Sequence, residues 1–121
     1  MIKVETDKPR NLVVVTYRGH VNRAEAQQKL LKVIAALEGM EPGFRLLTDF
    51  SELESMDYAC APEIEATMDL LRKKGVAEVV RVVPDPRKDI GFAVMSQFHY
   101  GHKTPVLTVD SRAEALQKLS A

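Results

Sequence analysis

Apolar and polar positions alternate at the start of the chain and recur at helical spacing further on. Ile2 and Val4 alternate with polar neighbours, a polar cluster containing a proline follows at 7–11, and an apolar run extends from Leu12 to Tyr17. Two extended runs separated by turn-forming residues are typical of a β-hairpin. We therefore expect the chain to open with two antiparallel strands.

A first helix is predicted over residues 23–38. Asn22 and Glu25 stand three apart, as in a capping box, and Gly39 follows the last apolar position. The three-to-four spacing assigns four apolar side chains to the inner face: Leu30, Val33, Ile34 and Leu37. It assigns three charged side chains to the outer face: Lys29, Lys32 and Glu38.

The middle of the chain predicts two strands with a helix between them. Phe44–Phe50 is nearly continuously apolar, as a central strand covered on both faces would be, and Val76–Val83 is the strongest strand signal. The second helix ends at the basic stretch Arg72–Gly75. It starts either at Asp57, with an irregular first turn, or near Pro62.

The last third of the chain predicts a helix, a short strand and a terminal helix. The third helix covers Arg87 to about Tyr100, and the strand Pro105–Val109 begins with a proline that places it at an edge or a strand start. Ser111 and Glu114 form a capping box for the terminal helix.

The predicted order is therefore β-β-α-β-α-β-α-β-α within one domain, residues 1–121. Alternating strands and helices indicate the α/β class. We expect a mixed sheet whose central strands are mostly parallel and covered by helices, with the opening hairpin as the antiparallel part.

Charge and composition exclude several classes of function. Lys and Arg total 17 and balance 17 Asp and Glu, which argues against nucleic acid and against a polybasic membrane anchor. No apolar run approaches the ~18 residues of a membrane span, and the amino terminus lacks a signal-peptide core. The one cysteine, Cys60, excludes an internal disulfide. These features predict a cytoplasmic protein without a membrane span.

The balanced charge also bears on assembly. A formal net charge of +0 leaves little repulsion between copies, so a homodimer is plausible. We place its interface at the opening hairpin edge or at the third helix, where Phe98, His99 and Tyr100 put aromatic side chains near one end. The same aromatic residues would serve equally well in the core.

Candidate metal and catalytic residues lack the partners that their chemistry needs. His99 and His102 are three apart, but neither CxxC nor HExxH accompanies them, and zinc needs three or four ligands. Cys60 lies near the start of the second helix, where the helix dipole would lower its pKa, yet a free cysteine is more often a small buried apolar residue. No phosphate-binding glycine motif occurs. We expect no metal, no cofactor and no enzymatic activity.

Three aspartates fall at or just after predicted strand ends: Asp49, Asp85 and Asp110. That edge of an open α/β sheet is where ligands bind. Asp85 and Asp110 are more simply explained as caps of the helices that follow. Asp49 remains a candidate binding residue because of the sequence that surrounds it, residues 46–57.

The segment Leu46–Asp57 resembles the central signature of the STAS superfamily. In that signature a buried strand ends in Asp or Asn, and a second aspartate opens a helix eight positions later, as Asp49 and Asp57 do here. The element order of the whole chain is similar to that of the family's SpoIIAA-like fold. Tyr17–Val21 also resembles the Tyr-x-Gly-x-Val opening of the stand-alone SpoIIAA-like (STAS/SEC14-type) bacterial domains.

The chain departs from the phosphorylation-switched members of that family. Their second aspartate is followed by two serines, of which the second accepts phosphate from a kinase, whereas Asp57 is followed here by Tyr58-Ala59-Cys60. Ala59 stands where the phosphorylated serine would be, so the usual switch cannot operate.

The resemblance implies a non-enzymatic regulatory or protein-interaction module. Its binding residues would be Asp49, Ser51, Asp57 and Tyr58, with the start of the second helix. The alternative is a carrier or sensor of a small apolar ligand such as a lipid, held between helices and sheet. The residues that would line its pocket, or simply fill the core, are Met56, Met68, Met95 and Phe98. An enzyme using Asp57 or Cys60 is the least favoured reading.

Overall fold

The computed structural model describes residues 1–88, 99–101 and 103–119. These residues form a five-stranded sheet in the order β1-β2-β3-β4-β5. The strands are β1 (Ile2–Asp7), β2 (Leu12–Val21), β3 (Arg45–Met56), β4 (Glu78–Val82) and β5 (Val106–Val109). The helices are α1 (Arg23–Leu37), α2 (Ala61–Lys73) and α4 (Arg112–Leu119), with short 3₁₀ turns η1 (Tyr58–Cys60) and η2 (Pro86–Lys88).

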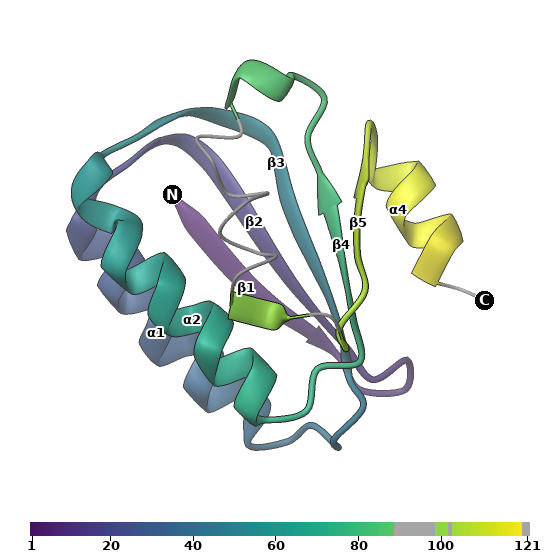
Figure 1. The fold of residues 1–121 in the computed structure, drawn as a ribbon. Helices are drawn as coiled ribbons and strands as arrows, with labels where there is room; N and C mark the ends of the chain where they lie inside the picture. The colour runs from purple at the N-terminus through teal and green to yellow at the C-terminus, as the bar shows by residue number, and fades with distance from the viewer. Residues whose placement is uncertain (89–98, 102, 120–121) are drawn as a thin grey trace.

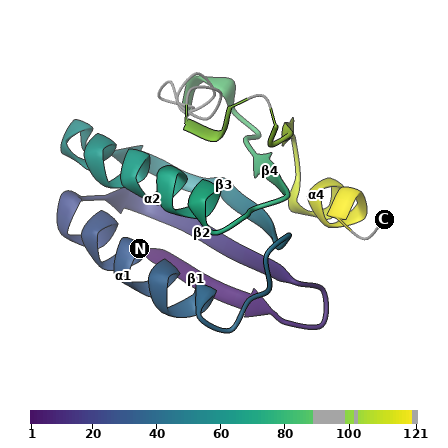
Figure 2. The same ribbon diagram turned by 60° about the horizontal axis from the view of Figure 1, so that its bottom comes forward.

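The sheet is mixed, as the sequence predicts. β1 pairs antiparallel with β2, and β2, β3, β4 and β5 pair parallel in succession. Helices α1 and α2 lie side by side over one face of the sheet, while α4 lies apart at the β4–β5 end (Figures 1 and 2). The α/β class, the opening hairpin and the central position of β3 are therefore confirmed.

The third predicted helix, 87–100, falls largely on residues 89–98, which lie outside the described residues. Its last residue, Tyr100, is buried in the core, so it is not part of an aromatic outer surface as the homodimer hypothesis assumed. Pro105 directly precedes β5, which is the last strand of the sheet, in agreement with its predicted position. Ser111 accepts the Glu114 amide at 3.1 Å and so caps α4 as predicted.

Two apolar clusters lie on opposite faces of the sheet. The larger one fills the space beneath α1 and α2, and the smaller one lies beneath α4. Alternate residues of β3 contribute side chains to the two clusters, because successive side chains of a strand point to opposite faces. Leu46 belongs to the larger cluster and Leu47 to the smaller. Burial of β3 on both faces explains its nearly continuous apolar sequence.

Helix α1 begins as predicted, with a reciprocal capping box between Asn22 and Glu25. Its rotation about its own axis differs from the prediction. Lys29 is 1% exposed, whereas Ile34 is exposed, so both were assigned to the wrong face. The buried side of the helix is formed by Ala26, Lys29, Val33 and Leu37. The long methylene stem of a lysine can replace an apolar side chain along such a stripe.

Strand β3 is longer than predicted, continuing past Phe50 to Met56. β4 accompanies it only as far as the pair Asp49–Val82, but β2 stays paired with it up to Met56, with two register shifts. Gly19, at φ +64°, lies at one of these irregularities. Asp49 is therefore in the middle of β3 and not at its end. Of the helices that the structure describes, none has the length and apolar character to cross a membrane.

Candidate functional site

The corner between β3 and α2 begins at Asp57. Its backbone N–H donates to the Val21 carbonyl at 3.0 Å, and its carbonyl accepts from the Cys60 amide at 3.0 Å. The carboxylate makes no capping hydrogen bond, so Asp57 does not cap a helix although an aspartate at a helix start commonly does so. Its Oδ1 instead lies 3.0 Å from His20 Nε2 on β2. The regular helix starts at Ala61 after the turn η1, as the alternative start near Pro62 predicted.

His20 connects β2 with both β3 and the corner. His20 and Ser55 are register partners in the parallel ladder, and His20 Nδ1 lies 2.6 Å from Ser55 Oγ. The imidazole therefore bridges a hydroxyl on one side and the Asp57 carboxylate on the other. Sequence reasoning missed His20, because only the strand register brings it to Asp57.

Tyr58 is the most prominent side chain of this corner. It is 90% exposed, although tyrosines usually bury much of their ring. Ala59 beside it is also exposed, while Cys60 points into the core. Asp57 and Tyr58, two of the predicted site residues, thus form one exposed surface with His20 and Ser55. We call these four residues the corner site.

The other two predicted site residues, Asp49 and Ser51, lie elsewhere. Asp49 is 3% exposed and directs its side chain to the α4 side of the sheet, where its Oδ2 accepts from Arg112 Nη1 at 3.2 Å. Its Oδ1 accepts from the Ser51 amide at 2.9 Å and from the Ser51 hydroxyl at 2.6 Å. Asp49 therefore connects α4 with the middle of β3 and does not adjoin Asp57.

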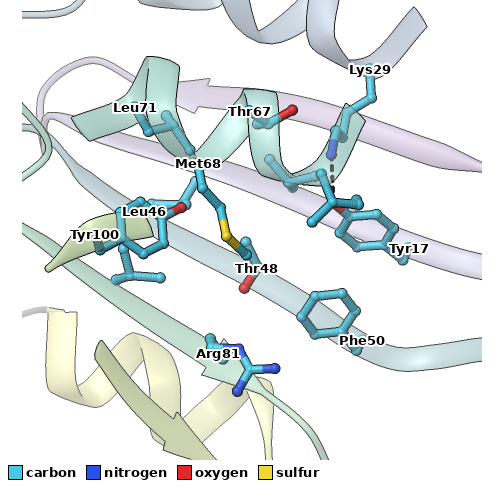
Figure 3. Close-up of a pocket in the computed structure, with 13 residues that line it drawn as sticks. Tyr17, Lys29, Leu46, Thr48, Phe50, Thr67, Met68, Leu71, Arg81 and Tyr100 are labelled. Atoms are coloured by element: carbon cyan, nitrogen blue, oxygen red, sulfur yellow. Dashed lines mark hydrogen bonds between the residues drawn. The ribbon is translucent and has the colours of Figure 1, made fainter. Parts of the chain in front are cut away.

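A cavity of about 30 Å³ lies between the sheet and helices α1 and α2 (Figure 3). Most of its lining is apolar and comes from the larger core cluster. The polar groups of its lining are Tyr17, Lys29, Thr48, Thr67, Arg81 and Tyr100. Of the four residues predicted to line a pocket, Met68 does so, Met56 packs half-buried against the core, and Met95 and Phe98 lie outside the described residues.

Lys29 is one of two basic residues among the described residues that line this cavity. Its Nζ donates to the Tyr17 hydroxyl at 3.1 Å and lies 5.6 Å from the centre of the Tyr17 ring. Burial lowers the pKa of Lys29 to about 7, although Cys60 and Glu63 act in the opposite direction. Burial also raises the pKa of the Tyr17 phenol. The Glu63 carboxylate is bound by Arg23 and Gln27, at 3.2 and 3.3 Å.

The candidate metal and nucleophile residues have other environments. His99 Nδ1 lies 2.8 Å from Asp69 Oδ1, and His102 is outside the described residues. Within the described ranges, no three His, Cys, Asp or Glu side chains gather in an arrangement that could hold a metal. The pKa of Cys60 is raised by burial, and secondly by Asp57, so the lowering expected from the helix dipole is wrong.

Solved structures with the same architecture include anti-sigma factor antagonists. The unphosphorylated form of SpoIIAA matches with a TM-score of 0.68 and 18% identity, covering 100% of this chain and 99% of that one. An uncharacterised Shewanella loihica protein with a SpoIIAA-like fold gives 0.71 and 18%, over 98% of this chain and 92% of that one. An anti-sigma factor antagonist from Mycobacterium paratuberculosis gives 0.63 and 19%, over 100% and 94%.

These matches establish the fold. The chain has a SpoIIAA-like fold over essentially its whole length, so the resemblance drawn from Leu46–Asp57 and from the element order is confirmed at the level of the fold. No protein-family model and no curated protein sequence matches the chain.

Proposed function

We propose that this protein is a non-enzymatic regulatory module that binds a partner protein through the corner site. The observation that carries the proposal is the 90% exposure of Tyr58 beside the Asp57–His20–Ser55 row. Tyrosine is enriched among the residues that dominate binding energy at protein interfaces. Two structural neighbours are anti-sigma factor antagonists, which supports a regulatory role by analogy of fold.

The chemistry of the corner site suits a partner that combines an apolar pocket with a cation. Tyr58 offers a large ring that loses solvent on binding, and Asp57 offers a half-exposed carboxylate next to it. Charge pairs at a rim affect specificity and association rate more than affinity. We therefore assign Tyr58 the larger share of binding energy and Asp57 the selection of the partner.

Variants of the corner site test this proposal by pull-down of host proteins followed by binding measurements. Tyr58→Ala is expected to weaken partner binding by about 2 kcal/mol, roughly 30-fold, and Asp57→Asn by roughly 3- to 10-fold. Both should unfold within a few degrees of wild type. Glu38→Gln, which changes another exposed carboxylate at the far end of α1, is the matched control and should bind like wild type. Equal binding by Asp57→Asn, Tyr58→Ala and wild type would contradict the proposal that the corner site binds the partner.

The proposed module operates without the phosphorylation that gives SpoIIAA its two forms. Ala59 offers no hydroxyl at the exposed position of the turn. We expect mass-spectrometric mapping of protein from its host to find no phosphate within residues 56–61. Stoichiometric phosphate on Tyr58 would contradict this and would mean that the corner is switched by a tyrosine kinase.

A second function is supported by a different observation. The cavity beneath α1 and α2 combines an apolar lining with a buried lysine whose pKa is lowered, and strongly shifted pKa values cluster at functional sites. We propose, as the alternative, that the protein carries or senses a small apolar ligand there. A native mass spectrum of protein made in its host separates the two functions, since a copurifying small adduct supports the carrier and a bound protein supports the module.

A further inference from the structure

The amine of Lys29 is buried and has one hydrogen-bond partner among the residues that the structure describes. An ammonium group has three N–H donors, and the Tyr17 hydroxyl engages one of them. No carboxylate oxygen of the described residues lies within ion-pair distance of Lys29 Nζ, and the nearby Glu63 is held by Arg23 and Gln27. A buried charge is stable only when it is paired or neutralised. Lys29 therefore has donors to offer a bound anion.

A second cation lines the same cavity from the sheet. Arg81 of β4 is 2% exposed, donates to the Thr108 hydroxyl at 3.1 Å and lies over the Phe50 ring at 5.7 Å. Figure 3 shows Lys29 and Arg81 approaching the cavity from α1 and from β4, with Met68 and Thr48 between them. The described lining contains no acidic side chain. Two basic side chains thus line a cavity whose other walls are mostly apolar.

We propose that this cavity binds a short-chain monocarboxylate, whose carboxylate accepts hydrogen bonds from Lys29 Nζ while its alkyl chain lies among apolar side chains near Met68. This rests on the second proposed function and names the chemistry of its ligand. A phosphate group is a poorer fit, because its higher negative charge would be buried beside a lysine whose pKa is lowered to about 7.

The size of the cavity restricts the length of the acid. About 30 Å³ is room for one or two water molecules, so even a four-carbon acid enters only if a lining side chain moves. Met68 is the side chain best able to yield, since methionine has three flexible torsions and fills irregular gaps. Long-chain fatty acids are excluded by the same argument.

Binding of a carboxylate should depend on pH in a defined direction. The groups that face Lys29 are Tyr17 from β2, Cys60 from η1 and Glu63 from α2. Cys60 and Glu63 raise the pKa of Lys29, but burial lowers it by more, to about 7. A bound carboxylate favours the ammonium form, so above pH 7 binding must take up a proton. Affinity should fall by up to about tenfold for each pH unit above 7.

Butanoate, butanamide and butylamine test the inference, because they share a chain and differ in the charge of the head. Nuclear magnetic resonance titrations of the full chain would follow the Met68 methyl group at pH 6.5 and 8.5. We expect butanoate to bind at least tenfold more tightly than either analogue at pH 6.5, and to weaken at least tenfold at pH 8.5. Lys29→Met should lose this preference, while Lys32→Met, an exposed lysine on the same helix, should keep it.

Two results would overturn the inference, and only one of them would also contradict the proposed carrier function. Equal binding of butanoate and butanamide at both pH values would show an apolar site without a carboxylate partner, and the carrier function would stand. No shift of Met68 with any of the three probes would remove both the carboxylate site and a small-molecule site in this cavity. The pH comparison uses wild-type protein, so it holds even if Lys29→Met fails to fold.

Discussion

Replacing Lys29 by methionine is expected to stabilise the protein at pH 7 by roughly 1 to 3 kcal/mol, and the gain should vanish or reverse near pH 10. Most substitutions of buried residues destabilise a fold. Lys29 is an exception because the residue is only 1% exposed and its amine has, within the described part of the chain, one hydroxyl as its hydrogen-bond partner. Methionine keeps the length of the stem without the charge.

The pH dependence follows from the lowered pKa. In the unfolded chain the amine titrates near its ordinary value of 10.5, and in the folded protein at about 7. Between these two values the unfolded state binds the extra proton, so stability rises with pH; below pH 7 both states are protonated and the full penalty applies. The penalty at pH 7 is on the order of 4 kcal/mol, and most of it is gone by pH 10.

The gain at pH 7 is smaller than this penalty because of Tyr17. Methionine leaves the buried Tyr17 hydroxyl without its partner, at a cost of about 1 to 3 kcal/mol. The double variant Tyr17→Phe/Lys29→Met removes both polar groups and should be more stable than Lys29→Met alone. Urea unfolding at pH 7 and pH 9.5 measures both effects, with Lys32→Met as the exposed control. A Lys29→Met variant that is less stable than wild type by the same amount at both pH values would refute the argument.

Local patterns were enough to predict most elements of this fold. The opening hairpin, the capping box at Asn22, the cap at Ser111 and the edge position of β5 all depend on neighbouring residues. The extent of β3 does not. Its second half is polar at Glu52 and Glu54 and remains a strand because β2 pairs with it, which is a contact between distant segments. Asp49 therefore looked like a strand end in the sequence and is a mid-strand residue in the structure.

Lys29 and His20 show what sequence reasoning misses at a site. Hydropathy assigns a lysine to the outside, since lysines are rarely buried. The spacing of Lys29 three residues after Ala26 and four before Val33 placed it on the buried stripe, and only its charge argued otherwise. His20 carried no local signal at all, because its partners Ser55 and Asp57 meet it through the strand register. The environment of both residues is set by contacts between distant segments, and neither residue lies in the Leu46–Asp57 signature.

The two aspartates of that signature are expected to differ sharply in their contribution to stability. Asp49→Ala should lower the free energy of unfolding by about 2 to 4 kcal/mol, because it removes a buried carboxylate and leaves the groups that donate hydrogen bonds to it without an acceptor. Asp57→Ala should cost less than about 1 kcal/mol, since its carboxylate is half exposed, caps no helix and pairs, among the described residues, with His20 alone.

The larger cost at Asp49 divides between its two oxygens. Oδ1 accepts both hydrogen bonds of Ser51, and Oδ2 accepts from Arg112, whose side chain is 40% exposed and can return to water when the partner is lost. Asp49→Asn keeps an oxygen for Ser51 and loses the charge that holds Arg112, so it should cost about half as much as Asp49→Ala. Urea unfolding of the three variants at one pH measures these differences. If Asp57→Ala proved as damaging as Asp49→Ala, the carboxylate of Asp57 would be holding the β3–α2 corner together, and a binding defect in its variants would no longer report on a partner surface.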